Sequence, residues 1–185
     1  NETSRAQPLF PMLAQDYFKE KNKLSFPCFI QPKLDGYRMI YQNGKCTSRQ
    51  GKEFDIIKNT TLMKELLSIK EKIALDGELY IHNGKFEHLG ILRKKNLNET
   101  DRLLLETIEY HIYDIIDTEK PYHTRNNDLC SLFEKYSFEK IKLVTTISVA
   151  NEEEIKQQSI FNTGVAALNA SCVPPTMSEN PCSMP

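Results

Sequence analysis

One lysine stands where it could act as a nucleophile. Lys33 follows an apolar run and opens the stretch KLDGYR, which also contains Gly36 and Arg38. A lysine attacks an electrophile only when its amine is deprotonated, and burial or a nearby cation lowers its pKa toward that state. Glycine lets a backbone approach a ligand closely. These residue types fit attack on a phosphate, but a solvated lysine beside a turn has the same local pattern.

Three stretches further along the chain carry a cation, a carboxylate and an aromatic ring. They are SRQG with Arg49, LDGEL with Glu78, and EYHIYDII with Tyr113. Attack on an α-phosphate with loss of pyrophosphate builds up negative charge, which cations and a divalent metal stabilise. Each stretch taken singly has an ordinary explanation, since exposed acids and buried aromatics are common. LDGEL would then be a surface hairpin, and Tyr113 a core residue.

The four stretches, in this order, resemble the motifs of the covalent nucleotidyltransferase superfamily, which contains ATP-dependent DNA ligases, RNA ligases and mRNA capping guanylyltransferases. KLDGYR is similar to the first motif, K-x-D-G-x-R, which implies that Lys33 attacks the nucleotide α-phosphate to form a lysyl-nucleotide. The resemblance also implies that Arg49 contacts nucleic acid or phosphate and that Glu78 holds the ribose or a metal-bound water. Tyr113 would stack on the purine, and Arg38 would bind hydroxyls or phosphate.

Other segments favour the DNA ligase branch over the capping enzymes. SRQG and the early stretch PLFPMLAQDY both resemble ligase segments. Gln31, two residues before Lys33, would read the adenine edge. The stretch FEHLGILRKK also looks ligase-like. If it forms a helix, its basic residues make a patch for DNA phosphates, although a solvated charge run is an equal reading. These residues are Arg93, Lys94 and Lys95.

The resemblance implies ATP as the nucleotide and Mg²⁺ or Mn²⁺ as the metal. Magnesium prefers one or two carboxylates together with phosphate oxygens and water, so Glu78 and Asp35 are candidate ligands. The implied reaction has three steps. Lys33 takes AMP from ATP, AMP passes to the 5′-phosphate of a nick in duplex DNA, and the 3′-hydroxyl then displaces AMP. A capping guanylyltransferase and a catalytically silent remnant that binds nucleotide or DNA are the alternatives.

The remaining pattern predicts an α+β fold with largely antiparallel sheets and flanking helices, that is, an incomplete ligase-type nucleotidyltransferase (ATP-grasp-like) domain. Asn-Gly pairs at 43–44 and 83–84 sit between alternating runs and predict two hairpins. Strands are expected at 26–33, 108–116 and 141–149, and helices at 59–72, 86–95, 126–140 and from 151.

Composition changes near residue 160. Glu179 is the only charged side chain after that point, and the segment carries four prolines and no lysine. We expect a partial adenylation domain at 1–160 and an irregular or disordered tail at 161–185. The later ligase motifs, a Glu-Gly segment and a Lys-x-Lys pair, have no match, so a truncated form with impaired activity is expected. Paired transition-state cations act as a unit, and their loss is costly.

The totals exclude several classes of protein. The 185 residues carry a net charge of −1, so nucleic-acid binding would rest on a local basic patch. Five cysteines without metal-ligand spacing favour reduced thiols and a cytoplasmic or nuclear setting. We find no signal-peptide pattern and no apolar run long enough to span a membrane. The oligomeric state is left open.

Overall fold

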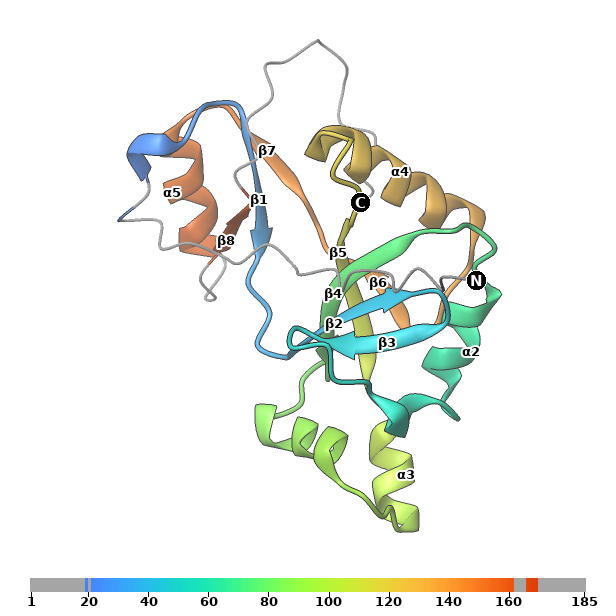
Figure 1. Cartoon of the computed structure of the whole chain (residues 1–185). Coiled ribbons are helices and arrows are strands. Elements are labelled where there is room, and N and C mark those ends of the chain that lie inside the picture. The colour runs from blue at the N-terminus through green and yellow to red at the C-terminus, as the bar shows by residue number, and fades with distance from the viewer. Residues whose placement is uncertain (1–18, 20, 162–165, 170–185) are drawn as a thin grey trace.

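The structure, a computed structural model, describes residue 19, residues 21–161 and residues 166–169, and its framework there is a pair of β-sheets (Figure 1). The three-stranded sheet has the order β7 (Ile147–Val149), β1 (Cys28–Pro32), β8 (Ala166–Asn169). The five-stranded sheet has the order β3 (Lys45–Ser48), β2 (Tyr37–Gln42), β4 (Ala74–Tyr80), β5 (Glu109–Ile115), β6 (Ile141–Leu143). Only the β5–β6 pair of these strands is parallel. The expected α+β class with largely antiparallel sheets is therefore confirmed.

The first predicted hairpin is confirmed. Strands β2 and β3 pair in antiparallel register from Met39–Ser48 to Gln42–Lys45. The two turn residues between them, Asn43 and Gly44, have φ angles of 50° and 74°. These are the left-handed conformations that an Asn-Gly turn favours.

The second predicted hairpin is wrong. Asn83 does have a positive φ of 57°, but the chain then enters a 3₁₀ helix, η3 (Phe86–Arg93), and not a return strand. The reason lies in the sheet, because β4 already pairs with β2 on one edge and β5 on the other. A strand following the turn has no free edge of β4 to join. Because η3 ends at Arg93, Lys94 and Lys95 lie beyond it, and the helix expected over 86–95 is only partly correct.

The strand predicted over 141–149 is divided between the two sheets. Its first part is β6 beside β5, and its last part is β7 beside β1. Residues 144–146 carry the chain across, after Val144 N–H donates to the Ile112 carbonyl at 2.9 Å. A run of β-branched residues shows that a segment is extended, but it does not show which sheet each end joins.

Helices surround the sheets: α2 (Thr61–Ser68), α3 (Glu99–Leu105), α4 (Tyr122–Lys135) and α5 (Glu152–Phe161), with short 3₁₀ turns η1 (Lys21–Lys23) and η2 (Asp55–Ile57). Thr60 caps α2 by accepting from Met63 N–H at 3.3 Å. That helix ends sooner than its apolar spacing predicts, since Ile69 is already extended. Ile69 still packs in the core, so the apolar spacing predicted its burial correctly although Ile69 lies beyond the end of the helix.

Each sheet has its own apolar core. The larger core joins one face of the five-stranded sheet to α2, η3 and α4, with Met39, Leu66, Tyr110 and Leu129 almost fully buried. A smaller cluster packs α5 on the three-stranded sheet through residues such as Ile30 and Ile155. The opposite face of the five-stranded sheet carries polar side chains. The nucleotide chemistry expected from the sequence falls on that face.

Three expectations concern the rest of the chain. Within the segment expected to be irregular, residues 166–169 form β8 against β1, so the expectation is wrong there. The other residues of 162–185, and PLFPMLAQDY at 8–17, lie outside the described residues. Cys28 and Cys46 are buried and carry free thiols. Among the described helices, none is long and apolar enough to cross a bilayer.

Candidate active site

A cleft of about 880 Å³ opens between the two sheets. Its size falls within the range of small-molecule sites, roughly 300–1,000 Å³. The end of β1, the start of β2, the turn after β3, one residue each of β4 and β5, and two residues of η3 contribute to its wall. Seven residues singled out from the sequence line it: Gln31, Lys33, Arg38, Arg49, Glu78, Arg93 and Tyr113.

Lys33 lies exposed at the mouth of this cleft, directly after β1 ends at Pro32. The loop that follows packs closely on β4. There is no room for a side chain at Gly36, since a Cβ there would collide with the Leu79 carbonyl oxygen. The Gly36 N–H donates to the Glu78 carboxyl, and the charge of Lys33 also acts on that carboxyl. The first and third motifs are thus in direct contact. Only glycine permits this approach of loop to strand.

The Glu78 carboxyl has an unusual titration. Burial raises its pKa to about 7, although the Gly36 N–H and the charges of Arg38 and Lys33 act in the opposite direction. Both charge states are therefore populated near neutral pH. A carboxyl of this kind suits a role that depends on neighbouring charge, such as binding a cation or a hydroxyl.

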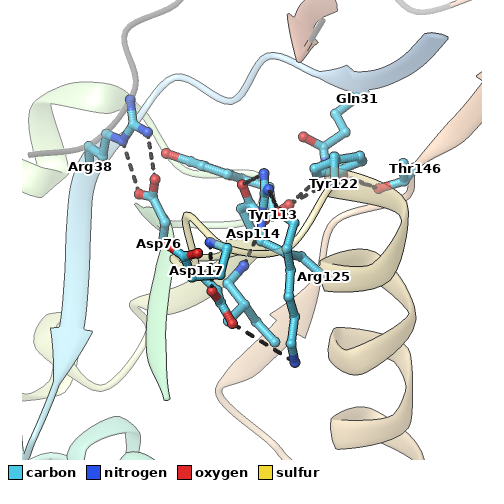
Figure 2. Close-up of polar contacts among 12 residues, drawn as sticks. Gln31, Arg38, Asp76, Tyr113, Asp114, Asp117, Tyr122, Arg125 and Thr146 are labelled. Atoms are coloured by element: carbon cyan, nitrogen blue, oxygen red, sulfur yellow. Dashed lines mark hydrogen bonds and ion pairs between the residues drawn. The ribbon is translucent and has the colours of Figure 1, made fainter. Parts of the chain in front are cut away.

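Arg38 is held in a fixed orientation by a carboxylate of β4. Its Nε and Nη2 donate to the two Asp76 oxygens at 3.0 and 2.6 Å, a bidentate arrangement. Arg38 Cζ lies 5.5 Å from the centroid of the Tyr113 ring. Figure 2 shows Tyr113 beside this ion pair, on the side away from the Arg38 backbone. Burial raises the pKa of the Tyr113 hydroxyl, so the ring stays uncharged.

Gln31 is buried at the inner end of the cleft, 4% exposed. Its Nε2 lies 3.0 Å from the Tyr113 carbonyl oxygen, 2.9 Å from Tyr122 Oη and 2.9 Å from Thr146 Oγ1. The side chain expected to read the adenine edge is therefore also a link between the three-stranded sheet and β5.

The expected DNA-binding residues separate into two groups. Arg49 is exposed at a turn closed by Ser48 Oγ, which accepts from Lys52 N–H at 3.1 Å. Arg93 stacks over the Tyr37 ring at 5.1 Å. Lys94 instead pairs with Asp101 at 2.6 Å, and Lys95 is exposed in the segment after η3; neither lines the cleft. The structure thus places the two arginines, and not the two lysines, on the wall of the cleft that Lys33 also lines.

The metal expectation has a similar outcome. Asp35 is exposed and does not line the cleft, whereas Glu78 does. In the part of the chain that the structure describes, no three His, Cys, Asp or Glu side chains gather to hold a metal ion. Magnesium bound with a nucleotide commonly takes one or two carboxylates, with phosphate oxygens and water completing the octahedron. The single carboxylate of Glu78 on the wall of the cleft fits that donor set.

Several residues that hold the lining side chains were not anticipated. Asp76 was recognised only as part of LDGEL, but it orients Arg38; the two-residue offset to Glu78 places both on one face of β4 and could have indicated this. No sequence pattern could have identified the partners of Gln31, because Tyr122 and Thr146 lie far from Gln31 in sequence and outside the four motifs.

Comparison with known families gives a match over most of the chain. A family model described as an ATP dependent DNA ligase domain matches residues 11–162. No curated protein sequence matches the chain.

Solved structures resemble the fold. A structure from a study of DNA binding by the minimal Lig E DNA ligases has a TM-score of 0.71 at 20% identity, over 90% of this chain and 64% of that one. The Chlorella virus DNA ligase-adenylate has a TM-score of 0.58 at 21% identity, over 77% and 51%. The bacteriophage T7 ATP-dependent DNA ligase in complex with ATP has 0.55 at 16%, over 80% and 57%. The chain spans less than two-thirds of each of these proteins.

Proposed function

The chain belongs to the ATP-dependent DNA ligase domain family, and from this premise we propose that it is the nucleotide-accepting part of a DNA ligase, in which Lys33 takes AMP from ATP. The observation that carries the proposal is convergence. Lys33, Arg49, Glu78 and Tyr113 come from four separate segments of the sequence, and together with Arg38 they line one cleft of about 880 Å³.

The proposed first step is a substitution at phosphorus. Lys33 Nζ attacks the α-phosphorus of ATP, a P–N bond forms, and the bond from that phosphorus to the bridging oxygen breaks. Pyrophosphate leaves with the electron pair, and the lysine loses a proton. The Arg38 guanidinium, fixed by Asp76, stabilises the charge that develops. Glu78 would hold a divalent cation here, and that cation would supply further neutralisation of the phosphate charge.

The purine would lie against Tyr113, whose ring is uncharged and faces the cleft. In the two later steps AMP passes to the 5′-phosphate of a nick and the 3′-hydroxyl displaces it. Nicked duplex DNA is therefore the proposed partner. Arg49 and Arg93 lie at the same cleft, where they can contact phosphates. In support, the T7 relative is described in complex with ATP, the Chlorella virus relative as an adenylate, and the Lig E relative as binding DNA.

The test is covalent labelling of the purified chain. With α-³²P-labelled ATP and Mg²⁺ we expect label that stays with the polypeptide through a denaturing gel, and mass spectrometry should place it on Lys33. Lys33→Ala should abolish it, while Lys64→Ala, at an exposed position of α2, should retain it.

Parallel reactions with labelled GTP decide between the branches of the superfamily. Labelling by GTP in preference to ATP would indicate a capping guanylyltransferase and contradict assignment as a DNA ligase. ATP binding by calorimetry with no covalent adduct would show a silent remnant and contradict the proposal.

A further inference from the structure

Tyr113 occupies a β-bulge. Asp76 of β4 faces Asp114, and Gly77 faces Ile112, so β5 has one residue more than β4 at this point and that residue is Tyr113. A bulge takes its extra residue out of the regular ladder and re-aims the side chain. The direction of the Tyr113 ring is therefore not set by strand pairing with β4, and other contacts have to set it.

One such contact comes from the other sheet. The Tyr113 carbonyl accepts a hydrogen bond from Gln31 Nε2, which belongs to β1. Because buried backbone carbonyls require partners, this bond replaces the one that the interrupted ladder does not supply. Figure 2 shows Gln31 approaching from the strand above, with Tyr122 between it and α4.

The amide of Gln31 is in turn held by two hydroxyls. Tyr122 Oη and Thr146 Oγ1 each lie 2.9 Å from Nε2, and they lie 3.4 Å from each other. Tyr122 Oη is also 3.4 Å from the Tyr113 carbonyl oxygen. Tyr122 belongs to α4, and Thr146 to the linker between β6 and β7. Two further elements thus meet at the point where β1 contacts the bulge.

The Tyr122 ring is itself fixed on both sides. Its centroid lies 5.1 Å from that of Phe29 and 5.4 Å from Arg125 Cζ. Arg125 donates from Nε and Nη2 to the two oxygens of Asp114 at 2.9 and 2.8 Å. Since Asp114 follows Tyr113 directly, the bulge is anchored to α4 immediately after the ring as well. At 1% exposure, Tyr122 does not itself line the cleft.

From this geometry we propose that Tyr122 and Thr146 are positioning residues, which hold the Gln31 amide against the Tyr113 carbonyl and thereby fix the Tyr113 ring in the nucleotide cleft. The inference rests on the proposed function, because it assigns these two hydroxyls to purine binding in the same cleft. Neither hydroxyl touches the reacting atoms. Both act through Gln31 and the bulge.

The hydrogen count makes the proposal specific. A glutamine amide has two N–H hydrogens, and here three oxygens lie within reach of them. Loss of one hydroxyl leaves two acceptors, so Tyr122→Phe or Thr146→Val alone should have a small effect. The double variant removes both hydroxyl acceptors from the amide, and its effect should exceed the sum of the two single effects.

The first test is the kinetics of covalent labelling by ATP. The double variant should raise the apparent KM for ATP about fivefold to tenfold, the scale of one buried hydrogen bond. The rate at saturating ATP should stay close to that of the wild type, because Lys33 follows a strand that β7 and β8 hold on both edges. A purely structural role would lower the rate at saturating ATP through loss of folded protein and leave the KM unchanged.

Tyr110→Phe is the matched control. Tyr110 lies on the same strand, and its hydroxyl donates to the Met39 and Leu75 carbonyls at 3.0 and 2.9 Å in the core. The variant loses a buried hydroxyl whose partners are the Met39 and Leu75 carbonyls and not Gln31 or the Tyr113 carbonyl, so its KM for ATP should not change. A rise in KM in the control equal to that in the double variant would overturn the proposal.

The second test needs no nucleotide and no turnover. The chain contains no tryptophan, so Tyr113→Trp creates a single fluorescent reporter at the bulge. Adding Tyr122→Phe and Thr146→Val to that variant should raise the quenching constant for acrylamide, whereas adding Tyr110→Phe should not. Unchanged quenching in the triple variant would refute the positioning role. Because the quenching measurement does not depend on covalent labelling, it still tests the positioning role if the protein does not adenylylate itself.

Discussion

At Glu78, opposing influences act on a single proton. Burial favours the neutral carboxyl, while the Gly36 N–H, Arg38 and Lys33 favour the carboxylate, and burial prevails with a pKa of about 7. In the unfolded chain the same group has the ordinary value of 4.5. Between these two values the folded protein holds a proton that the unfolded chain has lost. The free energy of unfolding therefore falls as the pH rises through this window.

We accordingly expect metal-free wild-type protein to lose thermal stability between pH 4.5 and 7 relative to Glu78→Gln. The variant keeps the shape of the side chain but has no titrating group there. The measurement is the difference in Tm between the two proteins across that range, so that the titration of other groups cancels. A difference that is constant with pH would show that Glu78 has an ordinary pKa.

The order of the motifs allowed the cleft-lining residues to be named from sequence. Lys33, Arg38, Glu78 and Tyr113 were chosen because four stretches matched in sequence, and the fold brings all four together. Lys94 could not be assigned in this way. A cation looks the same in sequence whether it faces a ligand or a neighbouring acid, and here the acid is Asp101, seven residues later.

At the scale of elements, two Asn-Gly pairs led to different outcomes. Both contain an asparagine with positive φ, as the turn signal predicts. Only the first joins paired strands, because β4, which precedes the second, is a central strand with neighbours on both edges. Turn chemistry is local and readable from sequence, whereas the availability of a strand edge depends on residues such as those of β5 that come later in the chain.

Glu65 of α2 is an anchor between elements that local patterns did not reveal. Its carboxylate accepts from three successive backbone N–H groups at the start of β6, those of Glu139, Lys140 and Ile141, at 2.7, 2.9 and 3.2 Å. Three donors directed at one carboxylate explain why α2 and β6 stay together although β4, β5 and three helices separate them in sequence.

Glu65→Gln should lower the free energy of unfolding by about 1–3 kcal/mol, because the amide nitrogen cannot accept and leaves partly buried N–H donors without this partner. Urea unfolding at neutral pH measures the loss. Glu134→Gln, an identical change at an exposed position of α4, is the control and should have little effect. Equal losses in the two variants would mean that charge, and not the bonds to β6, is responsible.

For the whole molecule, the two sheets and their order were beyond sequence reasoning, although the fold class was not. The pattern identified strands and helices but gave no means to divide residues 141–149 between sheets. The cleft exists because β1 belongs to one sheet and the motifs on β2, β4 and β5 belong to the other. Site residues were thus predictable from their types, and the space between them was not.

We expect the 185-residue chain to take up AMP without sealing nicks in repeated turnover. No lysine follows Lys156, so the sequence provides no later lysine pair to neutralise the phosphates. The same preparation should be scored on one gel for covalent label and for sealed strands of a nicked duplex. Sealed product in excess over protein would contradict this expectation.

The pairing of β1 has a consequence for how the protein forms during synthesis. This strand lies near the start of the described chain, yet β7 and β8, its two neighbours in the sheet, lie near the end. On the ribosome the five-stranded sheet can assemble once β6 has emerged, while β1 still waits for both partners. Contacts so distant in sequence close late and slowly. Strand β1, which directly precedes Lys33, is therefore synthesised early but joins its sheet last.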